Sequence, residues 1–343
     1  MKKLLNTLYV TSQDRYLSLE GETIVVKQEG KAVARLPLRN LESIIVFGYN
    51  GMSPALMGAC AERDIHVSFC TMYGKFLAEI RGPIHGNVFL RKKQYQISDH
   101  EEESLTIAKS FIIGKLYNSK AVIARACRDY PMRIDVDRLM GKVAYLSNSL
   151  FLVQEADSFE QLRGFEGEAA TVYFSVWDEL VLQQKEDFRF DRRSKRPPMN
   201  RTNALLSFAY SLLGSACTSA LECVGLDPFV GFMHTERPGR ASLALDLIEE
   251  LRPIMADRFV LTLINRRIIQ REDFLVKENG AVFLNDKGRK KFLEQWQERK
   301  KTIIKHPFLN EKVEWGLIPY TQALLLSRYI RGDLNGYPPF FWK

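Results

Sequence analysis

One stretch of the chain, residues 231–258, carries side chains that could bind a metal ion. His234 lies in a short, turn-like segment of this stretch. From about Ala241 the spacing of apolar residues predicts an amphipathic helix. The apolar run of this helix consists of Leu243, Leu247 and Leu251. A loop histidine therefore precedes a helix whose polar residues lie on or near the other face.

Two carboxylates on the predicted helix extend the pattern. Asp246 and Glu249 are three positions apart, so their side chains point the same way on a helix. Glu250 lies near the same face. A hard divalent cation binds carboxylate oxygens, and an imidazole nitrogen can be a further ligand. His234 and a carboxylate of this helix are thus candidate metal ligands.

A third ligand has to come from elsewhere, and Glu166 is the best candidate. It lies in the run 164–174, where small neighbours would let a backbone or a phosphate approach closely. The alternative is that Glu166 is an ordinary solvated side chain and His234 an ordinary hydrogen-bonded one. The spacing alone leaves both interpretations open.

Three short motifs contain these residues. They are Gly-Phe-Glu-Gly at 164–167, Gly-Phe-Met-His at 231–234 and Asp-Leu-Ile-Glu at 246–249, the last followed by Arg252-Pro253. In order and spacing they resemble the signature blocks of the CRISPR-associated Cas-one family, the integrase subunit that captures new spacers. The resemblance extends over essentially the whole chain, and its overall character is closest to the type I-C branch. One departure is Thr171, where many members carry a basic residue.

The resemblance implies a set of roles. Glu166, His234 and Glu249 would hold Mg²⁺ or Mn²⁺, and Asp246 would stand beside the site and orient His234 or a metal-bound water. The implied function is a metal-dependent DNA integrase and endonuclease. It would insert short DNA fragments (spacers) into a CRISPR array by transesterification from a 3′-hydroxyl. With water as the nucleophile, the same site would be a nuclease.

The resemblance also implies the partners. These are double-stranded DNA (protospacer and repeat), a second copy of the chain joined through the strand-rich domains, and a dimer of the Cas-two protein in an adaptation complex. Two other functions stay open at this point. One is a non-catalytic, DNA-binding scaffold subunit whose acidic cluster is structural, and the other is a stand-alone nuclease for branched DNA.

The charge distribution favours a polyanionic partner. The net charge is +8 over 343 residues. The segment 189–201 has six basic residues and one acid, and its two prolines indicate a loop. A second basic segment, 287–305, is partly helical in character and is equally well explained as a solvated helix face. The candidate phosphate-binding residues are Arg189, Arg192, Arg193, Lys195, Arg196, Arg201, Arg252 and Arg258.

Cysteine usage and hydropathy indicate a cytoplasmic protein, and the resemblance implies a prokaryotic one. The five cysteines show no paired spacing, which favours reduced core residues over disulfides or a zinc site. The first residues lack the long apolar region of a signal peptide. No window approaches 18 uninterrupted apolar residues, so no membrane span and no membrane partner are expected.

The predicted fold class is α+β. Residues 1–95 are expected to form a small β-sandwich-like domain with one helix at 54–63, because short strand patterns alternate with tight turns. The resemblance implies that this is the dimerisation domain. Residues 96–343 are expected to form a larger, mainly α-helical catalytic domain. A linker is expected at 83–96, and His66 and His85 are interpreted as structural or surface residues.

Four features of the helical region matter for the site. Ser158 begins a capping-box pattern, so a helix that carries Glu166 should start there. Thr202 is the expected cap of a long helix at 203–224. Tyr210 lies on that helix. It lines the site or packs in the core, and core packing is the more usual role for a tyrosine in such a position. The apolar, proline-stiffened tail at 337–342 is expected to pack on its own domain or to dock on a partner.

Overall fold

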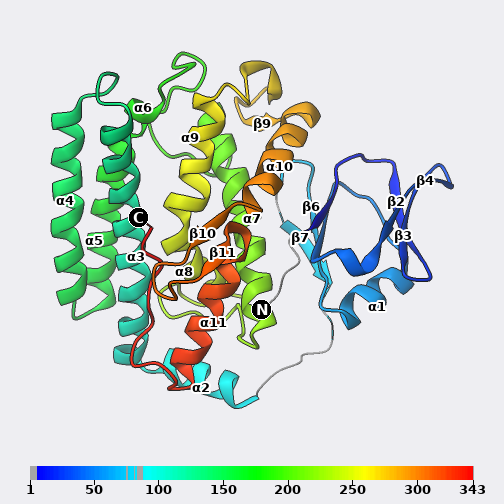
Figure 1. Cartoon of the computed structure of the whole chain (residues 1–343), viewed down its shortest axis with the longest axis horizontal. Helices are drawn as coiled ribbons and strands as arrows, with labels where there is room; N and C mark the ends of the chain where they lie inside the picture. The colour runs from blue at the N-terminus through cyan, green and yellow to red at the C-terminus, as the bar shows by residue number, and fades with distance from the viewer. Residues whose placement is uncertain (1–5, 75, 81, 83–87, 343) are drawn as a thin grey trace. The chain divides into compact units, whose positions relative to one another are not determined.

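The chain divides into two compact units. The computed structural model describes residues 6–74, 76–80, 82 and 88–342. The first unit comprises residues 1–86, 289–303 and 314–317, and the second comprises the rest of the chain (Figure 1). An α+β fold with an amino-terminal sheet region and a mainly helical remainder confirms the predicted fold class. The domain boundary at residues 95/96 stays a prediction.

The first unit is built from two sheets. Strands β2 (Arg15–Glu20), β3 (Thr23–Gln28) and β4 (Lys31–Pro37) form an antiparallel sheet. Strands β1 (Thr7–Val10), β5 (Ser43–Phe47), β6 (His66–Cys70) and β7 (Phe76–Ile80) form a second sheet in the order 1-5-6-7. The tight turns of this sheet, at 21–22 and 29–30, agree with the predicted alternation of short strands and turns. In the β3–β4 turn, Glu29 and Gly30 both have positive φ, which matches the right-handed twist of the strands.

Helix α1 (Pro54–Glu62) and the 3-10 turn η1 (Leu38–Asn40) complete the core of this unit. Ser53 caps α1 by accepting a hydrogen bond from the Leu56 N–H. The core contains side chains from both sheets and from the helix. Representative members are Leu17, Ile24, Ile44, Leu56 and Val67. Strand β1 was not predicted from the sequence.

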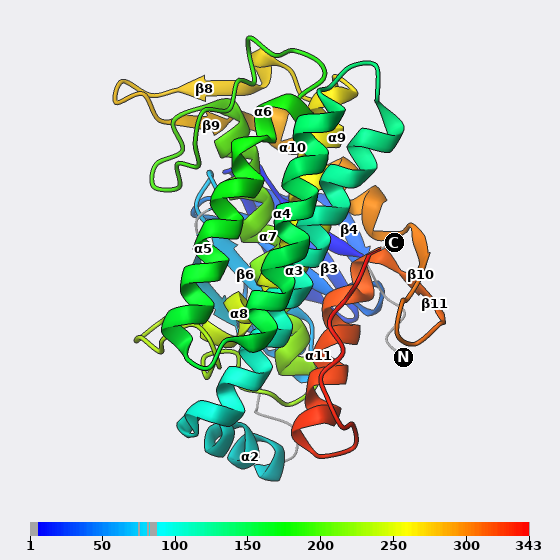
Figure 2. The ribbon, with the colours of Figure 1, turned by 90° about the vertical axis from the view of Figure 1, so that its left-hand side faces the viewer.

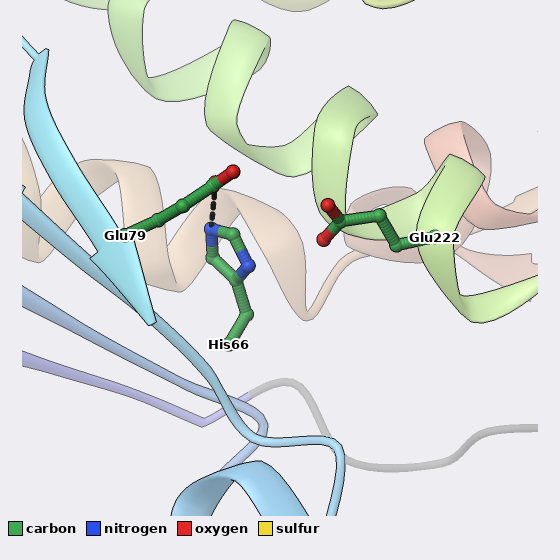
Figure 3. Close-up of side chains that lie close together, drawn as sticks. All are labelled: His66, Glu79 and Glu222. Carbon is green, nitrogen blue, oxygen red and sulfur yellow. Dashed lines mark ion pairs between the residues drawn. The ribbon is translucent and has the colours of Figure 1, made fainter. Parts of the chain in front are cut away.

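His66 has a structural environment, with one correction to the expectation from the sequence. Its ring is buried, and Nε2 lies 2.7 Å from the Ser68 hydroxyl and 3.9 Å from Oε2 of Glu79 (Figure 3). The sequence did not indicate an acidic neighbour for His66, because Glu79 is thirteen positions away along the chain. It comes close only through the antiparallel pairing of β6 and β7. His85 lies outside the described residues.

The second unit is mainly helical, and long helices lie side by side in it (Figure 2). Helix α3 (Glu101–Asp129) packs against α4 (Val136–Glu155), α5 (Phe159–Ser175) and α8 (Ser242–Leu251). Helix α7 (Arg201–Cys223) packs against α8 and α11 (Ile318–Ile330). The shorter elements of this unit are α6 (Trp177–Leu180), the π-helical turn η2 (Arg252–Asp257), α9 (Arg258–Asn265) and η3 (Arg271–Asp273). Most of α10 (Asp286–Lys300) and all of η4 (Trp315–Leu317) belong to the first unit.

Two short hairpins were not predicted. Strands β8 (Phe274–Val276) and β9 (Val282–Leu284) pair antiparallel, and β10 (Ile303–Lys305) pairs with β11 (Lys312–Glu314). Each strand has three residues, which is too short for an alternating apolar pattern to stand out.

The structure corrects two predicted boundaries. Residues 83–87 of the predicted linker lie outside the described residues, but from Val88 the chain is helix α2 (Val88–Asp99). Gln94 attaches this helix to the segment 227–230. Its buried side-chain amide donates to the carbonyls of Asp227 and Val230 and accepts from the Asp227 N–H. The cap of α7 is Asn200, whose Oδ1 accepts from the Asn203 N–H at 2.8 Å. Thr202 lies inside the first turn, and its hydroxyl donates to a backbone carbonyl.

Helix α7 also bears on the membrane expectation. By length and composition it is long and apolar enough to cross a bilayer, and within the described part of the chain no other helix meets that test. Just over half of its most apolar window, 56%, is buried inside the protein. A core helix satisfies the same criteria, so the absence of a membrane span stays a prediction.

The carboxy-terminal tail packs on its own unit. The Tyr337 hydroxyl donates to Glu250 of α8, and the Phe340 N–H donates to the same carboxylate at 3.1 Å. Asn118 of α3 bonds the backbone of Phe340 and of Trp342. The tail thus fastens α3 to α8. Burial raises the pKa of the Glu250 carboxyl to about 7, although hydrogen bonds from Tyr337 and other donors oppose the shift.

We predict that Glu250 makes stability depend on pH. A raised folded-state pKa means that the stabilising contribution is fully present below about pH 4.5 and is lost as the pH rises through about 7. Between pH 4.5 and 7 the free energy of unfolding of wild type should fall by about 1–3 kcal/mol relative to that of Glu250→Gln, which cannot ionise. Chemical denaturation of both proteins from pH 4 to 8 measures this. Exposed Glu102→Gln on α3 is the control, and a pH-independent difference between wild type and Glu250→Gln would contradict the prediction.

Candidate metal centre

The two predicted carboxylate ligands meet at one ammonium group. Glu166 lies on α5, and its helix begins at Ser158, whose hydroxyl accepts from the Gln161 N–H as predicted. Glu249 lies on α8 and is buried. The Lys115 ammonium, from α3, contacts Oε1 of Glu166 and lies 2.7 Å from Oε2 of Glu249. Residues far apart in sequence are therefore brought to one cation position.

Asp246 holds the loop that carries His234. Its Oδ1 accepts from Nδ1 of His234 at 2.7 Å and from the His234 backbone N–H at 3.0 Å. Its Oδ2 accepts from the N–H groups of Phe232 and Met233 at 2.7 and 3.1 Å. A Cβ at Gly231 would lie 2.8 Å from Oδ2, so only glycine allows this approach. Asp246 thereby fixes the imidazole and leaves Nε2 as the ring nitrogen that can bind a ligand.

The charges around Glu249 keep it ionised. Burial alone would raise the pKa of Glu249, but the nearby cations Arg252 and Lys115 lower it to about 2. The Arg252 guanidinium donates to Oε1 of Glu249 at 2.5 Å. Burial would lower the pKa of Arg252, whereas the Glu249 carboxylate raises it above its usual value. The centre therefore presents charged oxygen atoms to any ligand.

By residue type the three predicted ligands suit a hard divalent cation, although the structure does not bring all three ligand atoms within 4.8 Å of one another. Two carboxylates and one imidazole are a ligand combination that Mg²⁺ and Mn²⁺ accept. Oε2 of Glu249 is buried and accepts no hydrogen bond of good geometry from the described residues. It does form an ion pair with Lys115. Such an oxygen has a lone pair available for a metal. Asp246, by contrast, already accepts four hydrogen bonds.

A polar network borders the centre. The hydroxyls of Tyr173 and Tyr210 both donate to buried Asp257, at 3.1 and 2.5 Å. The guanidinium groups of Arg193 and Arg252 lie 5.1 and 4.9 Å from the centre of the Tyr210 ring. Burial raises the pKa of Asp257 to about 6, although its hydrogen bond from Tyr210 opposes the shift. Tyr210 is thus part of a network next to the centre and does more than fill the core.

A small cavity of about 20 Å³, room for about one water molecule, lies beside the centre. Its lining includes Lys115, Ala169, Ala170, Tyr173, Arg252 and Asp257. It therefore joins the centre to the polar network.

The basic loop at 189–201 divides into inward and outward residues. Arg193 donates to Asn203 and Ser207 at 2.8 and 3.0 Å, and Arg201 donates to the Asp187 carbonyl at 2.9 Å. These two residues hold the loop to α7. Lys195 lies close enough to the centre that, besides its partial burial, the charges of Arg252 and Arg193 lower its pKa.

The remaining predicted basic residues have different surroundings. Three of them are exposed on the loop, namely Arg189, Arg192 and Arg196. Arg189 pairs with Asp191 at 3.0 Å. Arg252 forms an ion pair within the centre, and the Arg258 guanidinium lies 4.4 Å from the centre of the Trp342 ring. The exposed Thr171 donates to its own helix, to the carbonyl of Gly167.

Lys115 and Asp257 were not identified from the sequence. One signal for Lys115 was available. It lies on the same helical face as the regularly spaced apolar residues Ala108 and Ile112, and a lysine on a core face needs a charged partner. Asp257 had no signal of comparable strength, because its partners come from two other helices.

Comparisons with known proteins identify the family. The family model of CRISPR associated protein Cas1 matches residues 8–298, and the chain belongs to this family. The chain is 47% identical to CRISPR-associated endonuclease Cas1 1 of Chlorobaculum tepidum over the full length of both. It is also 47% identical to CRISPR-associated endonuclease Cas1 2 of Rhodospirillum rubrum, again over both full lengths.

Solved structures share the fold. A Cas1 protein from Thermotoga maritima matches with a TM-score of 0.80 and 25% identity, over 95% of this chain and 97% of that one. A casposase bound to integration product matches with a TM-score of 0.85 and 23% identity, over 98% of this chain and 94% of that chain. A chain of a Cas6-RT-Cas1–Cas2 complex matches with a TM-score of 0.81 and 22% identity, over 98% of this chain and 36% of that chain.

We predict that Asp246 and His234 differ in their effect on stability. Asp246→Asn places an amide among backbone donors and should lower the free energy of unfolding by about 2–4 kcal/mol. His234→Ala removes a partly exposed ring and should cost less than about 1 kcal/mol. Urea denaturation of the two variants makes the comparison. Equal losses would show that Asp246 does not hold the loop.

Proposed function

We propose that this protein is a metal-dependent DNA endonuclease that acts as an integrase in CRISPR adaptation. It inserts short DNA fragments (spacers) into a CRISPR array by attack of a 3′-hydroxyl on a phosphodiester. The observation that carries the proposal is the convergence of Glu166 and Glu249 on one cation position. Membership of the Cas1 family and the full-length relatives named endonucleases support it.

In this proposal Glu166, His234 and Glu249 hold the cation, Mg²⁺ or Mn²⁺. When bound, the cation polarises the scissile phosphate and stabilises the leaving 3′ oxygen. Asp246 holds His234 in the tautomer that presents Nε2. Arg252 keeps Glu249 ionised and borders the small cavity beside the centre. Lys195 adds positive charge at the rim of the same centre.

The proposed partners follow from the same assignment. The DNA is double-stranded, as protospacer and as repeat. The chain works as a homodimer and binds a Cas2 dimer, since Cas2 is a component of the Cas6-RT-Cas1–Cas2 complex that shares this fold. We place the protein in the prokaryotic cytoplasm, without a membrane partner, and in the type I-C branch. A genomic neighbourhood without a Cas2 gene and a repeat array would count against this part of the proposal.

We predict that strand joining depends on the centre. Wild type is incubated with a repeat-bearing supercoiled plasmid, a short duplex with free 3′ ends and Mg²⁺ or Mn²⁺, with and without Cas2. Glu166→Ala and His234→Ala should lower joining at least about 100-fold, because each removes a metal ligand. Chelation by EDTA should abolish it. Glu168→Ala, on the exposed side of the same helix, is the matched control and should keep wild-type activity.

Three results are decisive in that assay. Joining by wild type and by Glu168→Ala, but not by Glu166→Ala or His234→Ala, supports the integrase. Nicking without joining, lost in the ligand variants, leaves a nuclease, and branched substrates then test the repair alternative. DNA binding with no strand chemistry under any condition, Cas2 included, overturns the proposal in favour of a scaffold subunit.

We predict that the exposed loop arginines contact phosphates. Arg192→Gln and Arg196→Gln should each weaken DNA binding and lower the slope of log affinity against log salt by about 1. Fluorescence anisotropy across a salt series measures the slope. Arg128→Gln, also exposed but at the end of α3, is the control. A slope that stays the same in the loop variants removes the loop from the DNA interface.

A further inference from the structure

Lys115 occupies the position to which the proposed metal ligands point. Its ammonium contacts Glu166 and lies 2.7 Å from Glu249, and the lysine is only 8% exposed. Neither the sequence motifs nor the proposed ligand set includes it. A buried cation held by two carboxylates does electrostatically what a metal ion at the same carboxylates would do.

The fold places Lys115 there by a close approach of two helices. Gly114, its neighbour on α3, lies so near α8 that a Cβ would come within 2.7 Å of the Glu250 Cβ. The missing side chain lets the α3 backbone lie against α8 next to Glu249. From this backbone position the four-carbon side chain of Lys115 extends to both carboxylates.

The local charges balance without any metal. Glu166 and Glu249 carry two negative charges, and Lys115 and Arg252 carry two positive ones. A divalent cation added to this group would leave an excess of two positive charges in a largely buried site. Such an excess is costly unless one cation leaves or an anion enters.

We propose that the Lys115 ammonium is an exchangeable internal cation of the centre. It neutralises Glu166 and Glu249 in the metal-free protein and gives up these carboxylates when a divalent cation binds. The released ammonium, which lies beside Arg252 at the same carboxylate, is then available to bind a DNA phosphate. Metal affinity is consequently low in the absence of DNA and rises when the phosphate supplies the missing negative charge. This inference rests on the proposed metal centre.

The first test is a Mn²⁺ titration of the full-length protein, with free Mn²⁺ measured by electron paramagnetic resonance, with and without a short duplex. Without DNA, Lys115→Gln should bind Mn²⁺ about tenfold more tightly than wild type, because the competing cation is gone. DNA should raise the affinity of wild type more than that of the variant. Lys115→Arg and the same-helix control Lys120→Gln should keep the low affinity.

The second test uses wild type alone and does not depend on a variant that folds. Acetylation of lysines, read by mass spectrometry, should label Lys115 several-fold more when Mn²⁺ is present, since the ammonium is then released from its two carboxylates. Lys120 should be labelled equally in both conditions. Unchanged labelling of Lys115 would overturn the inference.

The outcomes separate this inference from the proposed function. Equal or weaker Mn²⁺ binding by Lys115→Gln, with binding abolished in Glu166→Ala and His234→Ala, overturns the exchange while the metal centre stands. Absence of Mn²⁺ binding to wild type, both with and without DNA, overturns the metal centre and the exchange together.

Discussion

Burial of three carboxylates on one short helix is the constraint around which the helical unit is arranged. Asp246, Glu249 and Glu250 of α8 are all nearly inaccessible to solvent. A buried charge is tolerated only with well-placed partners. Backbone N–H groups of the preceding turn compensate Asp246, Lys115 and Arg252 compensate Glu249, and the carboxy-terminal tail with α11 compensates Glu250. Segments distant in sequence are thereby fixed around α8.

The kind of partner decides what each acid can do. Glu249 and Glu250 are adjacent and both buried, yet cations lower the pKa of the first to about 2, while burial against neutral donors raises that of the second to about 7. Glu249 is therefore charged at physiological pH. Glu250 is a clamp that fastens the tail. Asp246 is the third case, in which neutral backbone donors use up the lone pairs and leave a residue that positions its neighbour.

Basic residues are likewise divided between structure and binding. Arg193 and Arg201 form hydrogen bonds that fold the loop, whereas Arg192 and Arg196 remain exposed for a partner. A positive total charge does not by itself distinguish these groups. The hydrogen-bonded arginines explain how a proline-containing loop holds a defined place beside the centre.

Local signals in the sequence were enough to predict the main element types and the capping of α5 at Ser158, because periodicity and caps are read over a few neighbouring residues. They did not reveal the short hairpins, whose strands have too few residues to show a pattern. The ligand set of Glu166, His234 and Glu249 stays a prediction. The position of Lys115 between two acids, 51 and 134 positions away along the chain, depends on the tertiary fold. A lysine on a helix is usually solvated, and this one is buried with a charge to balance because α3 packs against both α8 and α5.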